Sequence, residues 1–392
     1  MRSPIAGIVA AAFLCFAGTP ASQAAVDKGP AGLAFYTPPE TLPKGTHGTP
    51  IWVRGLTGKA KLTSAKSNRL LLYLGQQTSG HDTAISGTVH VPKGKAPRGG
   101  WPIVTWAHGT IGIADACAPS RVGMPAQYDH KLLNTWLKAG YAVVRTDYEG
   151  LGTPTTHPYL IGVSEGRAVL DMVRGARKLD RSLGKRVVIA GHSQGGHAAL
   201  WAGALAGRWT PELDVRGTLA LAPASHLGEQ AALLGALTAP GPLTGLAAMI
   251  VRGVDVDRPA LNAASLLSDR ARVLFPQVDE VCLSDLTEGD SFGGLAPSEL
   301  LRPDGNLAPV IGALNENDPE TLKIRSGPVQ IEQGTTDTTV LPLFTNQLVP
   351  KLKAGGANVT YKTYTGVDHA GAVLNSRAAA DATKFVRSRL SR

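Results

Sequence analysis

A serine, an aspartate and a histidine of this chain have the types and the order needed for nucleophilic catalysis. Ser193 lies in residues 191–195, GHSQG, which fit the pattern G-x-S-x-G. A serine hydroxyl is a weak nucleophile unless a histidine takes its proton, and the histidine needs an acid to hold its tautomer. The alternative is an ordinary glycine-rich turn, so the surrounding elements must decide between the two.

The segments on either side of Ser193 favour the catalytic interpretation. Residues 185–191 (KRVVIAG) predict a buried strand, and residues 197–207 (HAALWAGALAG) predict a helix of small residues. A nucleophile on a sharp strand-to-helix turn needs this context, with glycines where neighbouring side chains would clash. The N-terminus of the helix also offers free N–H groups to a developing oxyanion.

The expected base and acid follow the last two predicted strands. His369 follows the strand at 358–366, and Asp337 ends the strand at 327–337. Active sites of open α/β sheets lie at the carboxyl ends of their strands, and the order Ser193, Asp337, His369 is the order of an α/β hydrolase. The sequence therefore predicts these three residues as a catalytic triad.

Four other titratable residues are weaker candidates for the base or the acid. Glu332 lies inside the strand before Asp337, and Asp368 is too close to His369 in the chain to face its ring. His192 and His197 flank the nucleophile, and we expect both to point away from a productive pairing with it.

The oxyanion hole requires two backbone N–H donors. We expect one from Gln194, directly after the nucleophile, and the other from Thr110 in residues 107–112 (AHGTIG), with Gly112 as the alternative. The segment 147–152 (DYEGLG) ends a strand on the same side and either lines the pocket or braces the oxyanion loop. The expected substrate-binding residues are His108, Gly109, Tyr148 and His192.

The pattern of elements predicts one large α/β domain. Strands at 101–109, 141–150, 185–191, 216–224, 327–337 and 358–366 alternate with helices, including a last helix at 370–390. This alternation predicts an α/β-hydrolase fold, with a mostly parallel central sheet flanked by helices. Residues 26–60 read as an extended arm and residues 69–91 as a hairpin. The core would comprise residues 25–224 and 327–392, with residues 225–326 inserted as a helical cap or lid.

The N-terminus and the cysteines indicate export. Residues 1–24 have the positive start, short apolar run and small-residue end of a secretory signal peptide. Cys15 would leave with it, and Cys117 and Cys282 would remain. Two cysteines in an oxidising compartment most often pair, and two buried free thiols are the alternative. The net charge of +9 is scattered rather than clustered, which argues against nucleic acid as a partner. No zinc-like spacing appears, and the chemistry requires neither metal nor cofactor.

Several short motifs together resemble a known family. They are FYTPP (35–39), HGT (108–110), CAPS (117–120), DYEGLG (147–152), GHSQGG (191–196), TTD (335–337) and DHAG (368–371). The chain resembles the secretory lipases of the α/β-hydrolase superfamily, which include fungal lipase A-like enzymes and bacterial exported relatives. The resemblance implies the same triad, a lid in the late insertion, and a Cys117–Cys282 disulfide that ties the oxyanion loop to the lid. The HGT form of the loop departs from the fungal enzymes.

We therefore expect a secreted serine ester hydrolase, a lipase or carboxylesterase, that acts through an acyl-enzyme. The same triad would also suit an acyltransferase or a polyester or amide hydrolase. A different class is a non-catalytic exported binding protein on the same scaffold. The expected partners are a small-molecule or lipid ester and at most a transient contact with a lipid interface, and we expect a monomer.

Overall fold

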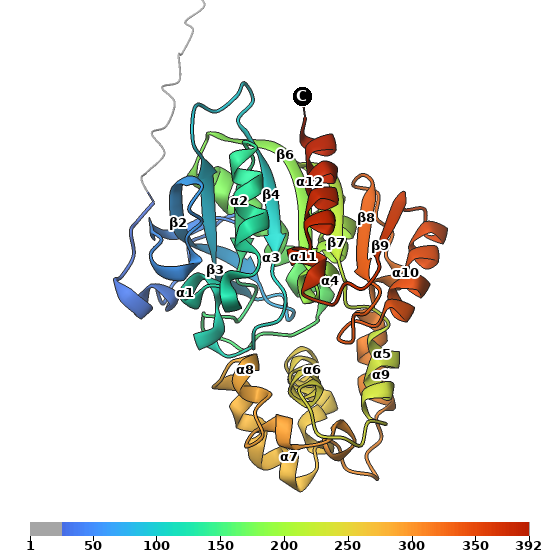
Figure 1. The fold of residues 1–392 in the computed structure, drawn as a ribbon. Helices are drawn as coiled ribbons and strands as arrows, with labels where there is room; N and C mark the ends of the chain where they lie inside the picture. Colours follow the sequence, from blue (N-terminus) through green and yellow to red (C-terminus); the bar gives the residue numbers. More distant parts are fainter. Residues whose placement is uncertain (1–25, 392) are drawn as a thin grey trace, which may run out of the picture.

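The core of the protein is a mixed sheet with a large parallel part. The computed structural model describes residues 26–391, and the predicted signal peptide lies outside the described residues. Within them the sheet has nine strands in the order β1-β2-β3-β5-β4-β6-β7-β8-β9 (Figure 1). Pairs from β4/β5 to β8/β9 are parallel, while β1/β2, β2/β3 and β3/β5 are antiparallel. The strands are β1 Pro50–Gly55, β2 Ala65–Gln76, β3 Asp82–Pro92, β4 Trp101–Ala107, β5 Ala142–Thr146, β6 Leu183–His192, β7 Asp214–Leu221, β8 Val329–Gly334 and β9 Val359–Tyr364.

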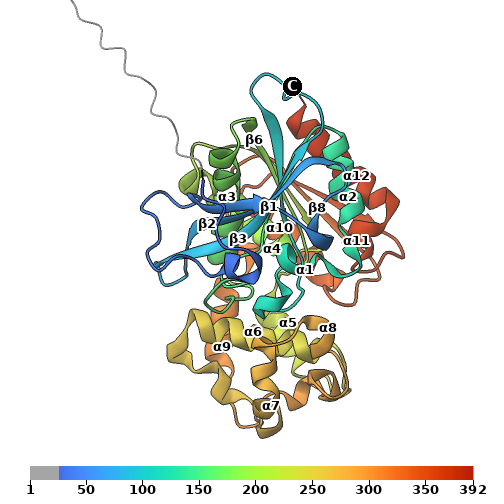
Figure 2. The ribbon, with the colours of Figure 1, turned by 90° about the vertical axis from the view of Figure 1, so that its left-hand side faces the viewer.

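Helices cover both faces of this sheet, as the α/β-hydrolase prediction requires. One face carries α3 (Gly162–Leu179), α4 (Gln194–Trp209) and α10 (Pro342–Ala354). The other carries α2 (His130–Lys138), α11 (Gly371–Leu374) and α12 (Ser376–Leu390), as Figure 2 shows for α3 against α2 and α12. Aliphatic and aromatic side chains fill both faces, so the central strands β4 to β8 are largely buried on both sides, which is the usual state of a parallel sheet, while the edge strands β1 and β9 are partly exposed.

Two elements differ from their predicted form. The expected extended arm contributes β1, which pairs antiparallel with β2 and extends the edge of the sheet. The expected helix at 370–390 is broken into α11 and α12 at Asn375, whose side chain accepts the N–H groups of Arg377 and Ala378. An asparagine that caps a new helix in this way is more stable in an extended conformation than in a helix interior.

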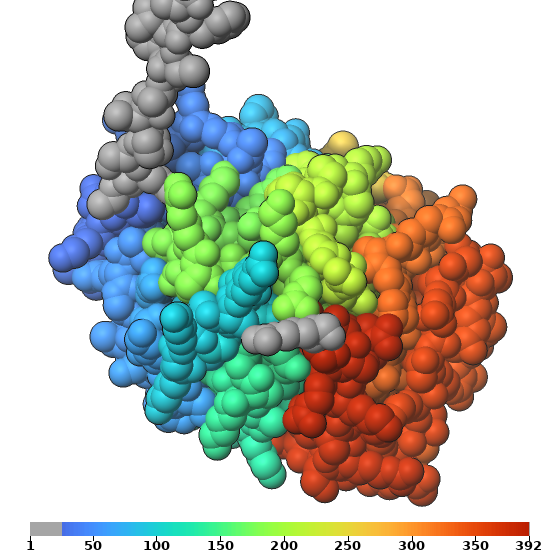
Figure 3. All heavy atoms as spheres, turned by 90° about the horizontal axis from the view of Figure 1, so that it is seen from above, coloured from blue at the N-terminus to red at the C-terminus, as the bar shows by residue number. Residues whose placement is uncertain are grey.

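A helical segment connects β7 to β8 and covers one end of the sheet. Its helices are α5 (Leu227–Leu234), α6 (Leu243–Asp257), α7 (Asp269–Leu274), α8 (Leu283–Leu286) and α9 (Ala308–Glu316). In Figure 1 they lie below the sheet, on the side toward which β4 points. They share an apolar cluster, which includes Met249, Phe292 and Leu314 and also takes in Tyr159 and Leu160 of the core. We call this segment, residues 225–326, the cap. The opposite end of the molecule, seen in Figure 3, is formed by segments of the core.

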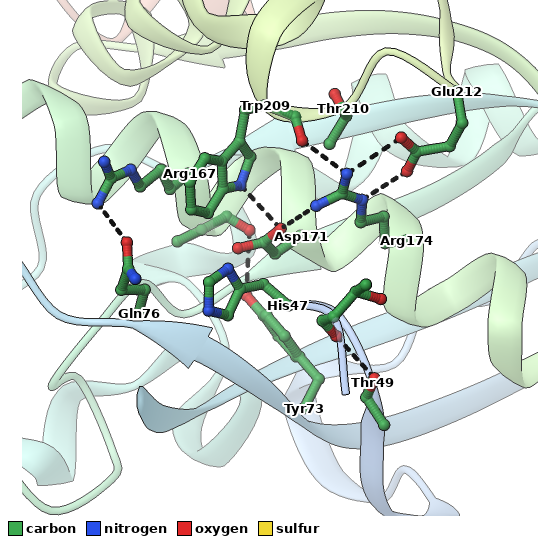
Figure 4. A network of polar contacts seen from close by, with 12 residues as sticks. His47, Thr49, Tyr73, Gln76, Arg167, Asp171, Arg174, Trp209, Thr210 and Glu212 are labelled. Atoms are coloured by element: carbon green, nitrogen blue, oxygen red, sulfur yellow. Dashed lines mark hydrogen bonds and ion pairs between the residues drawn. The ribbon is translucent and has the colours of Figure 1, made fainter. Parts of the chain in front are cut away.

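A polar network fastens the N-terminal arm to the core (Figure 4). The ring of His47 stacks on Trp209 with 5.1 Å between centroids. Trp209 in turn donates its indole N–H to Asp171 Oδ1 at 2.9 Å, and Arg174 bridges Asp171 and Glu212. Burial raises the pKa of Asp171 to about 7. These contacts hold the arm against α3 and the end of α4, on the face of the sheet away from α2 and α12.

No helix among residues 26–391 combines the length and the apolar character that a bilayer crossing would demand.

Candidate active site

The turn between β6 and α4 places Ser193 in a strained conformation. Ser193 has φ 59° and ψ −121°, a region that side-chain-bearing residues rarely occupy. Its N–H donates to the carbonyl of Leu221 at 2.9 Å, and its carbonyl accepts the N–H of His197 at 3.1 Å. The turn is thus held by the neighbouring strand and by the first turn of α4. The serine is only 8 % exposed.

The two glycines of the motif are required by close backbone approaches. A Cβ at Gly191 would lie 1.9 Å from the carbonyl oxygen of Gly195, and a Cβ at Gly195 would lie 2.0 Å from that of Ala107. Both distances are far below van der Waals contact, and the atoms met are backbone, which cannot move aside. The G-x-S-x-G spacing therefore has a packing reason at this turn, in addition to the conformation of Ser193.

The structure brings Ser193, His369 and Asp337 into one hydrogen-bonded chain. His369 Nε2 lies 2.9 Å from Ser193 Oγ, and His369 Nδ1 lies 2.7 Å from Asp337 Oδ2. A carboxylate accepts only, so Nδ1 carries the proton and Nε2 is free to accept the serine proton. The side chain of Asp337 is fully buried, and that of His369 is 20 % exposed.

The loop after β8 prepares Asp337 to stay ionised. Its Oδ1 accepts the N–H groups of Thr339 at 2.9 Å and Val340 at 2.8 Å, and its Oδ2 accepts an amide N–H of Gln333 at 3.0 Å. Burial raises the pKa of Asp337, but the hydrogen bond and charge of His369 and the two backbone donors outweigh it, so the pKa lies below its usual value. A negative charge next to His369 would stabilise an imidazolium during proton transfer.

Glu332, the other candidate for the acid, lies elsewhere in the core. Its Oε1 accepts the amide N–H of Gln330 at 2.6 Å, and its Oε2 lies 3.0 Å from the hydroxyl of Tyr364. Burial raises the pKa of Glu332 to about 8, so it is protonated at neutral pH. The hydroxyl of Tyr364 also lies 3.0 Å from Asp381 Oδ2. Glu332 is thus a neutral structural group here.

Replacing Glu332 with glutamine is expected to remove a pH dependence of stability. The pKa of Glu332 is 4.5 in a model peptide and about 8 in the fold, so between these values the folded protein holds a proton that the unfolded chain lacks. The stabilisation is full below the unfolded pKa and is lost as the pH rises through the folded one. As the pH rises through this window, the free energy of unfolding of the wild type should fall relative to that of Glu332→Gln by up to about 1.4 kcal/mol per pH unit. Urea unfolding of both proteins across the window measures this difference, and parallel curves would contradict it.

The predicted oxyanion donors lie at the start of α4 and in the loop after β4. Gln194 opens α4, so its N–H is one of those that no helical carbonyl reaches. Thr110 is partly buried, and its hydroxyl hydrogen-bonds to that of Tyr159 at 2.7 Å. The alternative, Gly112, has φ 119° and packs against the disulfide, since a Cβ there would lie 2.8 Å from Cys117 Sγ. The donor roles of Gln194 and Thr110 stay predictions.

A disulfide joins Cys117 to Cys282, with 5.5 Å between their Cα atoms. The bond connects the loop after β4 to the start of α8 in the cap. Next to it, the N–H of Leu283 donates to the carbonyl of Ile111 at 3.0 Å. The loop after β4 and the cap are therefore joined both covalently and through the backbone.

The expected substrate-binding residues brace the site in this structure. Tyr148 is buried and donates its hydroxyl to the carbonyl of His108 at 2.9 Å. Burial lowers the pKa of His108 to about 3, so its ring is neutral. His192 Nε2 lies 3.0 Å from the carbonyl of His369 and donates to it, so it holds the backbone of the base. A Cβ at Gly109 would lie 3.3 Å from His192 Nδ1. Substrate contact by these four residues stays a prediction.

One cluster among residues 26–391 has a composition and spacing suited to a metal ion. The donor atoms of His226, Asp318 and Glu320 lie within 4.8 Å of one another. The two oxygens of Asp318 already accept the N–H groups of Leu227 at 2.7 Å and Glu320 at 3.0 Å, and the ammonium of Lys351 forms an ion pair with Glu320. Protein donors thus compensate these carboxylates, and the cluster ties the first cap helix to the segment after α9.

The sheet, the strand-to-helix turn and the cap define an α/β hydrolase. Solved structures share this fold: Candida antarctica lipase A has a TM-score of 0.73 at 23 % identity, covering 86 % of this chain and 80 % of that one. A rice cell wall degrading esterase from Xanthomonas oryzae has a TM-score of 0.73 at 20 % identity, covering 88 % and 99 %. The profile of the secretory lipase family matches residues 118–391, and the chain belongs to this family.

Curated relatives carry lipase names, and one is named as inactive. A probable inactive lipase of Mycobacterium tuberculosis is 26 % identical over 85 % of this chain and 76 % of its own. Lipase A of Moesziomyces aphidis is 27 % identical over 66 % of this chain, and the match spans 57 % of that enzyme. A secreted triacylglycerol lipase of Malassezia globosa is 24 % identical over 91 % and 78 %.

Proposed function

We propose that this protein is an exported serine hydrolase of carboxylic esters that works through an acyl-enzyme. The hydrogen-bonded chain from Ser193 through His369 to Asp337 supports this most directly. His369 would take the proton of Ser193 as its oxygen attacks the ester carbonyl, and would then pass that proton to the departing alcohol. A water molecule, deprotonated by the same histidine, would release the acid and restore the serine.

The charge that develops on the carbonyl oxygen needs donors aimed at it. The backbone N–H groups of Gln194 and Thr110 are the proposed pair, since Gln194 follows Ser193 directly and Thr110 lies in the loop after β4, the strand that pairs in parallel with β6. Such donors act in a site with little water, and removing one typically costs about 10²–10³ in kcat. No step requires a metal or a cofactor, and this stays part of the proposal.

Features of the cap support an apolar acyl group. Ala224 donates its N–H to the carbonyl of Ser193 at 3.3 Å, and α5 begins three residues later, at Leu227. Further along, Ala231 and Leu234 of this helix line a cavity inside the cap that is walled almost entirely by aliphatic side chains and whose lining includes none of the three triad residues. An acyl chain gains about 0.8 kcal/mol for each methylene it buries in such surroundings. We propose that the substrate is a lipid or small-molecule ester, and that the protein works as an exported monomer that touches lipid interfaces transiently.

A non-catalytic binding protein is the competing function, and the relative named as inactive makes it a specific alternative. The two are separated by treating the mature protein with a fluorophosphonate probe and mapping adducts by mass spectrometry. We expect one adduct, on Ser193, and turnover of p-nitrophenyl esters across a series from acetate to palmitate, whose profile separates esterase from lipase. An unlabelled, folded protein would overturn the proposed function. Transfer of the acyl group to an added alcohol, or cleavage of a polyester or an amide, would instead assign a different reaction to the same triad.

A further inference from the structure

A buried polar cluster lies behind the turn that carries Ser193, and the proposed proton transfers do not use it. It consists of Gln194, His157, Glu165, His197 and Asn317, each at most 5 % exposed. The members come from α3, α4, the loop before α3 and the end of the cap. Burying this many polar groups costs free energy unless every donor meets an acceptor. The positions of the protons therefore show which side chain holds which.

The side chain of Gln194 is held by two acceptors. His157 Nδ1 donates to the carbonyl of Glu149 at 2.8 Å. Burial lowers the pKa of His157, so the ring is neutral and its Nε2 carries no proton. The amide nitrogen of Gln194 lies 2.9 Å from this Nε2 and 2.8 Å from Glu165 Oε1. The two amide protons of Gln194 are therefore both used, and the side chain has one orientation.

Glu165 is held in turn by a buried histidine. His197 Nδ1 lies 3.0 Å from Glu165 Oε2, and His197 Nε2 lies 2.8 Å from the carbonyl of Asn317. A carbonyl only accepts, so His197 Nε2 carries a proton. Burial lowers the pKa of His197, but the hydrogen bond and the charge of Glu165 outweigh it and raise the pKa. The two residues therefore form a hydrogen-bonded pair whose side chains have no exposed surface.

We propose that Glu165 and His197 are positioning residues that aim the backbone N–H of Gln194 at the oxyanion, by holding the side chain of the same residue from behind. This proposal rests on the proposed function. The Ser193–Gln194 peptide follows a residue with positive φ, and the hydrogen-bonding power of its N–H depends steeply on direction. A side chain with two fixed hydrogen bonds resists rotation of that peptide. Because Asn317 lies at the end of the cap, the cap's last segment also helps to hold the donor.

The test compares variants that break the anchor with one that can rebuild it. Gln194→Met removes both hydrogen bonds at nearly the same volume, and Glu165→Leu removes the acceptor. Each is expected to lower kcat by about 10–100-fold with KM changed by less than about threefold, since the oxyanion forms only after binding. Glu165→Gln can keep its Oε1 as the acceptor and donate to a neutral His197, so it should keep most of the activity.

A transition-state analogue distinguishes positioning from general damage. A boronic acid that forms a tetrahedral adduct on Ser193 should lose affinity in each variant by the same factor as kcat/KM. Gln330→Met is the matched control, because Gln330 is also a buried glutamine that donates to a buried glutamate, Glu332. It should lose stability while its kcat/KM and boronate affinity stay within about twofold of wild type, since it touches no group that stabilises the transition state.

Each outcome decides one proposal. If wild type is labelled and active but folded Gln194→Met matches it in kcat/KM and boronate affinity, the positioning role is wrong. If wild type is neither labelled nor active, the proposed function fails first. If Gln194→Met does not fold, His157→Phe removes one acceptor but keeps an aromatic ring stacked on Tyr148. It should lower kcat and boronate affinity together by about 3–10-fold, as expected for the loss of one of two hydrogen bonds, and unchanged values would again overturn the role.

Discussion

Replacing Ser193 with alanine is expected to lower kcat for p-nitrophenyl butyrate by about 10⁶-fold, because no other group can form the acyl-enzyme. The histidine, the aspartate and the oxyanion donors would remain, so the residual rate would reflect binding and electrostatics alone. The fold should survive, since the backbone of Ser193 carries the contacts with Leu221 and His197. Kinetics with active-site titration measure the loss, and far-UV and near-UV circular dichroism check the fold.

A second serine provides the control for this experiment. Ser326 donates its hydroxyl to the carbonyl of Gly203 at 2.7 Å, in the half of α4 farther along the chain from Ser193. Ser326→Ala should keep activity within about twofold, as is usual for a partly buried site away from the chemistry. If Ser193→Ala loses less than about tenfold, the hydrolysis uses another nucleophile.

Replacing Asp337 with asparagine is expected to lower kcat by about 10⁴-fold through the tautomer of His369. Asp337 Oδ1 accepts two backbone N–H groups, from Thr339 and Val340, so the amide oxygen of an asparagine must take that position. The NH₂ group is then forced to the position of Oδ2, where it donates to His369 Nδ1. The proton moves to Nε2, which can no longer accept from Ser193.

Asp368 is the matched control for Asp337. It adjoins His369 in the chain, and its Oδ1 accepts the N–H of Gly371 at 2.8 Å rather than a proton of the imidazole. Asp368→Asn should keep kcat within about threefold, because an exposed capping group adds little to the transition state. Measuring kcat of both variants over a pH range tests whether Asp337 acts through the tautomer of His369. Equal losses of kcat would show that Asp337 acts only through local charge.

The sequence went far toward the fold because the fold's main signals are local. Apolar runs of strand length alternate with helical spacing along most of the chain, and parallel sheets repeat this pattern. Those runs place Ser193, Asp337 and His369 after β6, β8 and β9, which belong to the row of four adjacent strands β6-β7-β8-β9. The need for Gly191 arises within a few residues of the nucleophile, from the carbonyl of Gly195, whereas the need for Gly195 arises from the backbone of Ala107 on a neighbouring strand.

The local sequence signals were weaker at the edge of the sheet and at the break between α11 and α12. The strand β1 forms because β2 offers it an unpaired edge, and this pairing cannot be predicted from either segment alone. The break at Asn375 depends on one side chain that caps a helix in preference to continuing another. In such places two conformations have similar local free energies, and packing selects between them.

By itself, the sequence determined the class of fold, the order of the proposed triad and the motifs of the secretory lipase family. Only the tertiary structure decided which polar groups meet. Glu332 became a neutral core acid, His192 came to hold the backbone of His369, and Glu165 met both Gln194 and His197. Periodicity is a property of neighbouring residues, whereas the protonation and direction of a buried side chain depend on groups that only packing brings within hydrogen-bond distance.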